Sequence, residues 1–222
     1  MPLNPNTPIS YLITDGRTHP ETTAASPEFT RLLAFVGAGV GARVSLIQLR
    51  EKLLRPRLLY ELTAQAVALT KGSPTRLLVN DRADIALAAG ADGVHLTTRS
   101  LDAALIRRIS KSNFLIGVST HSLAEARAAR AAGADFAVFG PVFDTPSKRI
   151  YGAPLGLDQL REAAHTLAPF PLLALGGLTL ENARDAIGAG ARGVAAVRLF
   201  SEAQRLDWIV SQLVSTSPAN HC

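Results

Sequence analysis

Short apolar runs alternate along the chain with segments whose apolar residues recur every three to four positions. Most of the runs are continuously apolar, as in FAVF (136–139), which favours parallel strands covered on both faces. The runs predict strands at 9–14, 42–49, 76–80, 93–96, 114–119, 136–141, 172–177 and 193–199. The remaining segments have the periodicity of amphipathic helices, at 26–39, 55–72, 82–90, 100–110, 122–133, 157–167, 179–190 and 201–214.

One phrase recurs three times where a predicted helix passes into a predicted strand: AAGADGVHL (88–96), AAGADFAVF (131–139) and GAGARGVAAV (188–197). A repeated helix-to-strand joint is typical of stacked β/α units. With eight strands alternating with eight helices, the chain is predicted to be α/β, a single-domain (β/α)8 TIM barrel over 9–214, with an N-terminal extension (1–8) and a C-terminal tail (215–222). A doubly wound open sheet is the alternative, but no G-x-G-x-x-G follows any predicted strand.

Composition narrows the functional classes. The 222 residues are 47% hydrophobic and 18% charged, as in folded globular proteins. The net charge is +5, but the 23 basic residues are scattered, which argues against a nucleic-acid partner. There is no apolar run of about 18 residues to span a membrane, and MPLNPNTPIS (1–10) is unlike a signal peptide. With Cys222 as the single cysteine, these features predict a cytoplasmic protein. They leave open whether it forms a homo-oligomer.

Polar residues follow the predicted strands, and in a TIM barrel the loops at those ends build the active site. The set is rich in cations, hydroxyls and glycine amides: Arg50, Lys52, Asn80, Asp81, Ser119, Lys148, Gly176, Gly177 and Arg198. The glycine pair after strand seven, with the helix start after strand eight, matches the usual phosphate pocket of these barrels. The sequence therefore predicts a site for phosphate esters.

Five motifs at these ends carry a resemblance to a known family. They are QLREK (48–52), NDR with ALAAGADGVHL (80–96), GVSTHSLAEA (117–126), GPVFDTPSK (140–148) and LLALGGLTLENA (172–183). In this order, from about Tyr11 to Phe200, they resemble the thiamine phosphate synthase/TenI family. Synthases of that family join hydroxymethylpyrimidine pyrophosphate to a thiazole phosphate and release pyrophosphate, so the expected partners are small phosphorylated pyrimidine and thiazole substrates.

The resemblance also implies roles for individual residues. Arg50, Lys52 and Lys148 are expected to be catalytic by stabilising the leaving group, and Asp81 to bind Mg2+. The expected substrate-binding residues are Gln48, Asn80, Ser119, Thr145, Ser147, Gly176, Gly177 and Arg198.

Two positions depart from the synthase pattern. Ser100 stands where synthases usually carry a second acidic metal ligand, and Arg198 stands where a small residue is common. Magnesium dependence therefore stays open, with Asp81 as the remaining carboxylate. TenI proteins, which isomerise a thiazole phosphate, carry a proton-transferring histidine where this chain has Pro141. A TenI-type tautomerase and a non-catalytic phosphate-binding barrel remain alternatives to the synthase.

Some of these residues also have structural interpretations. Asp81 could cap the helix that begins near Arg82, and Gly176 and Gly177 could serve close packing. His95, inside a strand, is expected to be a hydrogen-bonded wall residue rather than a catalyst.

Overall fold

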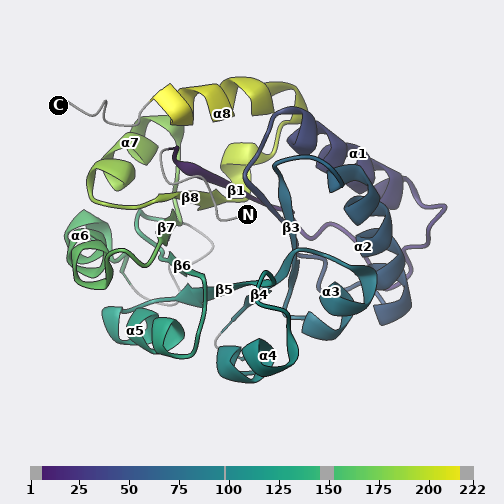
Figure 1. The fold of residues 1–222 in the computed structure, drawn as a ribbon. Helices are drawn as coiled ribbons and strands as arrows, with labels where there is room; N and C mark the ends of the chain where they lie inside the picture. Colours follow the sequence, from purple (N-terminus) through teal and green to yellow (C-terminus); the bar gives the residue numbers. More distant parts are fainter. Residues whose placement is uncertain (1–6, 98, 146–152, 216–222) are drawn as a thin grey trace.

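The computed structural model describes residues 7–97, 99–145 and 153–215. Eight parallel strands form a closed barrel in the order β1 to β8, with helices around it (Figure 1). The strands are β1 (Ile9–Ile13), β2 (Leu46–Leu49), β3 (Arg76–Asn80), β4 (Gly93–Leu96), β5 (Leu115–Thr120), β6 (Phe136–Phe139), β7 (Leu172–Leu175) and β8 (Gly193–Ala196). The predicted (β/α)8 barrel is confirmed.

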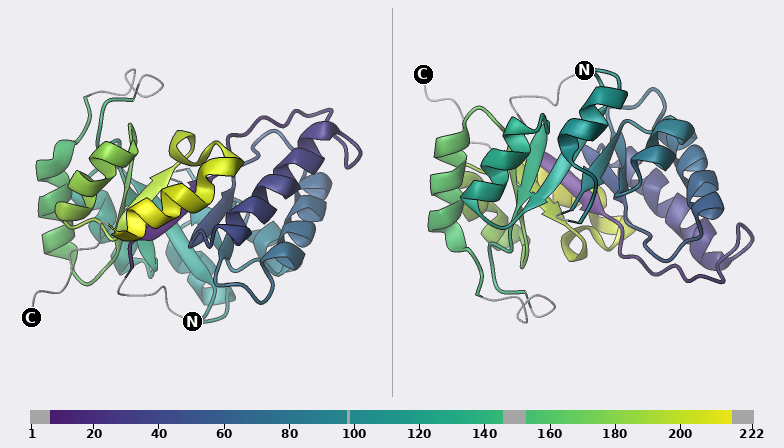
Figure 2. Two further views of the ribbon diagram at one scale, coloured as in Figure 1. Left: turned by 90° about the horizontal axis from the view of Figure 1, so that it is seen from above. Right: turned by 90° about the horizontal axis from the view of Figure 1, so that it is seen from below.

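The outer layer consists of the helices that follow the strands. They are α1 (Pro27–Gly41), α2 (Pro56–Thr70), α3 (Ala83–Ala89), α4 (Ala103–Ile109), α5 (Leu123–Ala131), α6 (Gly156–Leu167), α7 (Leu180–Gly188) and α8 (Leu206–Ser215). α8 lies between α7 and α1 and completes the ring, as Figure 1 and the left view of Figure 2 show. None of the helices within the described ranges is both long and apolar enough to cross a membrane.

Two apolar layers hold the barrel together. The larger one packs outward-facing strand residues such as Leu12, Ile47 and Val194 against the helices. The second fills the barrel interior and includes Tyr11 and Phe136. Closure is parallel, with Tyr11 opposite Ala195 in the register between β1 and β8. Buried strand side chains on both faces explain why the runs read as continuously apolar.

The repeated helix-to-strand joint is also confirmed, and its aspartates have a structural role. Asp92 accepts a hydrogen bond from Leu77 N (2.9 Å) and pairs with Arg76. Asp135 accepts one from Ile116 N (2.7 Å) and pairs with Arg107. Each carboxylate therefore ties the start of one strand to the preceding strand. The aspartates of the repeat serve the scaffold, not the chemistry.

Several predicted boundaries differ from the structure, and three of them have a clear physical reason. β2 begins at Leu46 rather than at residue 42, because Ala42 caps α1 and Arg43 has a left-handed backbone with φ of 54°. β8 ends at Ala196, since Arg198 already begins a short 3-10 helix, η2 (Arg198–Phe200). A second one, η3 (Ala203–Arg205), delays α8 to Leu206. Apolar pattern alone does not distinguish a strand from the tight turn that continues it.

Candidate active site

The carboxyl ends of the eight strands meet at one end of the barrel, because all of them run parallel. The predicted site residues Arg50, Asn80, Ser119, Gly177 and Arg198 lie at the ends of five of these strands or in the loops that follow. Ser147 and Lys148 belong to the loop after β6 and lie outside the described residues. Their expected roles stay predictions.

Gln48 and Asn80 are bonded to each other across β2 and β3. The Nε2 atom of Gln48 donates to Oδ1 of Asn80 at 3.0 Å. Gln48 is only 2% exposed, whereas Asn80 is partly exposed at the strand end. The arrangement presents Asn80 to the mouth of the barrel, with Gln48 fixing its amide.

Arg50 and Lys52 follow β2 and flank a buried glutamate. Arg50 is partly exposed and Lys52 is exposed, while Glu51 between them is 3% exposed. A Cβ built on Gly16 would lie 3.8 Å from Nη1 of Arg50, so the guanidinium lies beside the loop after β1. Arg50 and Lys52 are therefore accessible at this strand end, whereas Glu51 is not.

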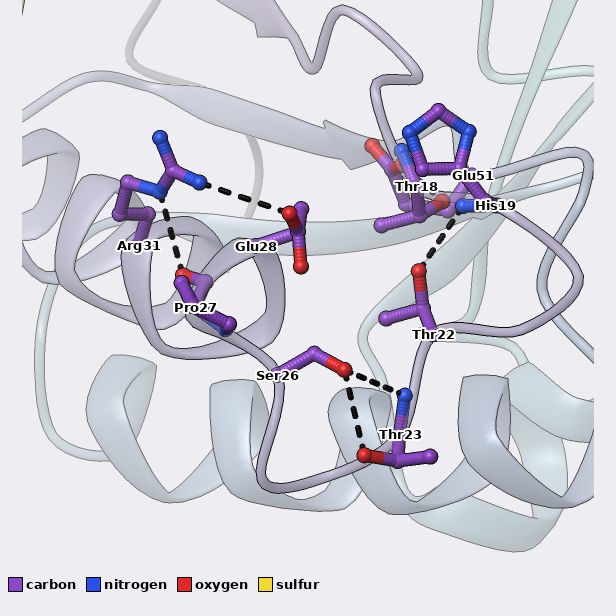
Figure 3. A network of polar contacts seen from close by, with 9 residues as sticks. All are labelled: Thr18, His19, Thr22, Thr23, Ser26, Pro27, Glu28, Arg31 and Glu51. Atoms are coloured by element: carbon purple, nitrogen blue, oxygen red, sulfur yellow. Dashed lines mark hydrogen bonds and ion pairs between the residues drawn. The ribbon is translucent and has the colours of Figure 1, made fainter.

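Glu51 is held by threonines of the β1–α1 loop, one of which also holds Arg50. Figure 3 shows the second of them, Thr18, beside Glu51. Its carboxylate accepts from Thr14 Oγ1 and Thr18 Oγ1, both at 2.6 Å, and from Thr18 N at 3.4 Å. Thr14 Oγ1 in turn accepts from Arg50 N at 2.8 Å. Further along the loop, Thr22 accepts a hydrogen bond from His19 N at 2.9 Å. The network fixes the backbone of Arg50 at the mouth.

A cavity of about 820 Å3 opens beside this network. Its lining includes Ile13, Val197, Thr18 and Glu51, residues of α1 such as Phe35, and the segment after β8 that includes Gln204. The cavity therefore lies between the β1–α1 loop, α1 and the segment after β8.

Asp81 adopts an unusual backbone conformation at the end of β3. Its φ is 64°, in the left-handed region that residues other than glycine seldom occupy, and its N donates to His95 O at 2.8 Å. The N-cap of α3 is Arg82, with no side-chain cap bond, so the capping interpretation of Asp81 is wrong. The carboxylate of Asp81 is therefore exposed at the end of β3 and does not cap α3.

Ser100 is engaged in a local turn after β4. Its hydroxyl accepts from Thr97 N at 2.7 Å and lies 3.1 Å from Thr97 Oγ1. Within the described ranges, no group of three or more His, Cys, Asp or Glu side chains could hold a metal ion. Among the described residues expected to bind a metal, Asp81 is therefore the carboxylate that remains.

Gly176 and Gly177 pack tightly against the loop after β6. A Cβ on Gly176 would lie 2.6 Å from Pro141 Cβ, and one on Gly177 would lie 2.5 Å from Asp144 O. Both have positive φ, 98° and 62°. The structural interpretation therefore accounts for both glycines, and phosphate binding by their amides stays a prediction. Thr145 is beside them and donates to Phe143 O at 3.1 Å.

Arg198 is exposed at the start of η2, after β8. Its carbonyl accepts from the N and Oγ of Ser201, at 3.1 and 2.8 Å, so the turn that carries the side chain is well bonded. Its exposed side chain gives the end of β8 a positive charge.

His121 is a residue to which the sequence assigned no role. Its Nδ1 hydrogen-bonds to the carbonyl of Gly140, directly before Pro141. A carbonyl only accepts, so Nδ1 carries the proton, and in the neutral ring Nε2 has a lone pair. Its position after β5 was the available signal, since neighbouring strand ends lie side by side.

Buried His95 is paired with partly exposed Ser119 near the end of β5. His95 Nε2 lies 2.9 Å from Ser119 Oγ, as expected for a hydrogen-bonded wall residue. His95 is 2% exposed, and burial lowers its pKa from 6.5 to about 3. The ring is therefore neutral at physiological pH.

We expect this neutral histidine to make unfolding easier in acid. Below pH 6.5 the unfolded chain binds a proton that folded His95 refuses until about pH 3. Stability should therefore fall as pH decreases across this window, by up to about 1.4 kcal/mol per pH unit. Urea unfolding between pH 5 and 7 measures the slope, and H95Q should reduce it by nearly one proton. Exposed His165 is the control, since H165Q should leave the slope almost unchanged. Equal slopes for the wild type and H95Q would contradict the expectation.

Comparisons with known proteins agree with the motifs. The family model described as "Thiamine monophosphate synthase" matches residues 11–200. The thiamine-phosphate synthase of Methanoculleus marisnigri is 41% identical over 192 residues, covering 84% of each chain. That of Roseiflexus sp. is 39% identical over 189 residues, covering 85% of this chain and 76% of the relative.

A solved structure extends the likeness to the whole fold. The thiamine phosphate pyrophosphorylase from Pyrococcus furiosus superposes with a TM-score of 0.76 at 30% identity, covering 94% of this chain and 98% of the other. Barrel, motifs and family match cover the same residues, and the chain belongs to the thiamine monophosphate synthase family of enzymes.

Proposed function

We propose that this protein joins hydroxymethylpyrimidine pyrophosphate to a thiazole phosphate, forming thiamine phosphate and pyrophosphate. The observation that carries the proposal is the gathering of Arg50, Asn80, Ser119 and Arg198 around one mouth of the barrel. These are cations and hydrogen-bond donors, as two phosphorylated substrates require. The names of the family relatives support the same reaction.

In the proposed reaction, the bond between the pyrimidine methylene carbon and the pyrophosphate oxygen breaks, and both electrons leave with the oxygen. The methylene cation is captured by the lone pair of the thiazole nitrogen, which forms the new carbon–nitrogen bond. Negative charge grows on the leaving pyrophosphate. Arg50 is suited to stabilise it, because its fork of N–H groups matches phosphate oxygens and its backbone is fixed through Thr14. We assign the same role to Lys52 and Lys148.

The residues around Asp81 fit a magnesium ion that is shared with substrate. Asp81 offers one exposed carboxylate, and Mg2+ is commonly held by one or two carboxylates plus substrate phosphates and water. When bound, the ion would neutralise charge on the pyrophosphate. Ser100 would remain outside the coordination sphere, since its hydroxyl is bonded to Thr97.

This arrangement predicts how the magnesium requirement changes with the two residues. D81N should raise the magnesium concentration for half-maximal activity by about tenfold or more, because the one carboxylate is lost. S100D should lower it, because one oxygen of the new carboxylate can keep the bond to Thr97 N while the other serves as a second ligand. Activity measured against magnesium concentration tests both. The control is D84N, since Asp84 lies nearby on α3 and pairs with Arg82. An unchanged requirement in D81N would rule out the shared ion.

A TenI-type tautomerase is the second candidate, and the position of His121 favours it. The histidine that TenI proteins use lies where this chain has Pro141, and His121 hydrogen-bonds to Gly140 directly before it. With Nδ1 donating to that carbonyl, Nε2 is left to accept a proton. H121Q is the variant that would separate this activity from the synthase.

One assay divides the candidates. The purified chain is given both substrates, with and without magnesium, and thiamine phosphate and pyrophosphate are measured. The synthase predicts equal amounts of both products. Conversion of the thiazole phosphate without the pyrimidine substrate would support the tautomerase. Binding of either substrate without conversion, under every divalent metal, would indicate a non-catalytic barrel and overturn the proposal.

A further inference from the structure

His95 is locked in an aromatic cluster inside the barrel. Its ring lies 5.6 Å from that of Tyr11 at an edge-on angle and 6.1 Å from that of Phe136. Tyr11 and Phe136 are themselves edge-on at 5.7 Å, and all three side chains are almost fully buried. A Cβ on Gly117 would lie 2.8 Å from His95 Nδ1 and 2.3 Å from Phe136 Cζ. Packing therefore fixes the orientation of the imidazole, and Gly117 leaves room for it.

The two nitrogens of this ring have different surroundings. Nε2 faces Ser119 Oγ at 2.9 Å. Nδ1 is buried and has no hydrogen-bond partner among the described residues, and the same holds for the Tyr11 hydroxyl. A neutral imidazole carries one N–H, so the proton is either on Nδ1 or on Nε2.

The environment favours the proton on Nε2. A proton on Nδ1 would leave a buried N–H unpaired, which native proteins rarely tolerate. On Nε2 the proton is donated to Ser119 Oγ. The lone pair left on Nδ1 then lies in the cluster that also contains the Tyr11 hydroxyl, a donor whose own partner is missing.

This tautomer sets the direction of the Ser119 hydroxyl. If Ser119 Oγ accepts from His95, its own hydrogen points elsewhere. Ser119 is partly exposed near the end of β5, on the side of the mouth. We propose that His95 is a positioning residue that holds Ser119 as a hydrogen-bond donor toward a negatively charged oxygen of the bound phosphate ester. The inference deepens the proposed function and rests on it only for the identity of that ester.

The alternative is a His95 that only fills the wall. In that case Ser119 could donate to Nε2, and its oxygen would face the mouth as an acceptor, which repels phosphate. The two arrangements differ in the tautomer of His95, which is measurable in the wild-type protein without any substrate.

Nitrogen-15 NMR of the histidine rings in the full chain tests the tautomer. The signal of His95 is identified by its disappearance in H95Q. We expect a protonated Nε2 and an unprotonated Nδ1, unchanged between pH 5 and 8. A protonated Nδ1 would overturn the proposal. The measurement needs no turnover, so it stands even if the synthase reaction fails.

The donor role is tested with inorganic pyrophosphate as the probe, by calorimetry. H95L should weaken pyrophosphate binding by about tenfold, the loss of one hydrogen bond to a charged group. H95Q, whose amide can donate from a similar position, should restore most of it. In the S119A background, H95L should have no further effect, because His95 acts only through Ser119. Equal weakening in both backgrounds, or no rescue by glutamine, would show a merely structural role. Thermal melting identifies any variant that fails to fold, and the NMR result then decides.

Discussion

R50A is expected to lower kcat of the synthase reaction by about 10²- to 10³-fold. The guanidinium lies beside the loop after β1 at the mouth, and the backbone N of Arg50 is held by Thr14 Oγ1 at 2.8 Å. A positioned donor that meets charge as it develops on a leaving group is commonly worth this much. The fall should appear in kcat more than in KM, because the charge on the pyrophosphate grows as the bond breaks. Steady-state kinetics with both substrates measure it.

Arg17 provides a matched control at the same end of the barrel. It is highly exposed and pairs with Asp15 at 2.6 Å, so R17A should change kcat less than about twofold. R50K should retain part of the activity, since it keeps the charge but loses the planar fork. Similar losses in R17A and R50A would show that only the general positive field matters. That result would remove Arg50 from the catalytic residues.

The strand ends could be predicted from the sequence, because the alternation of apolar runs and amphipathic segments is enough to indicate this fold. Each apolar run predicts a strand, and eight alternations leave few other topologies. Arg50 and Asn80 could therefore be assigned to the same end of the barrel before any of their contacts were known. Two of the helix starts could also be predicted from local sequence: Ser122 and Thr179 accept from the backbone N three residues later, as N-caps do.

Contacts between loops could not be predicted from the sequence. Ser100 looked like a missing carboxylate, but its hydroxyl is bonded within its own turn to Thr97. The sequence assigned no role to His121, and its ring hydrogen-bonds to Gly140, directly before Pro141. Both depend on rotamers and on the register between strands. A sequence pattern contains neither, because each hydrogen bond is decided by atoms of two segments at once.

The contacts of Glu51 are a further example that could not be predicted from the sequence. Between two cations, its natural interpretation is an ion-pair partner, and the structure places it among threonines instead. The Thr14 hydroxyl donates to the carboxylate and accepts from Arg50 N, so the buried acid and the exposed arginine share one anchor. Substitution of Glu51 should therefore lower both the stability of the fold and the activity that depends on Arg50.

E51A is expected to destabilise the protein by about 3 kcal/mol. The carboxylate is 3% exposed and accepts two hydroxyl bonds at 2.6 Å and one amide bond at 3.4 Å. Its removal leaves buried donors without an acceptor, at about 1–3 kcal/mol each, although the hydroxyls can turn to other partners. E51Q should cost less, since one oxygen still accepts. Urea unfolding at neutral pH measures both.

The matched control is Glu61, which pairs with Arg57 on the surface of α2 at 3.1 Å. E61A should change stability by less than about 0.5 kcal/mol, because exposed pairs of this spacing contribute little. Below its unfolding temperature, E51A should also lose kcat, since the loss of the carboxylate frees Thr14 to turn away from Arg50 N. If E51A is stable but has a reduced kcat, Glu51 contributes to activity alone. If it is unstable but has full kcat, Glu51 contributes to stability alone. The shared anchor through Thr14 requires both losses together.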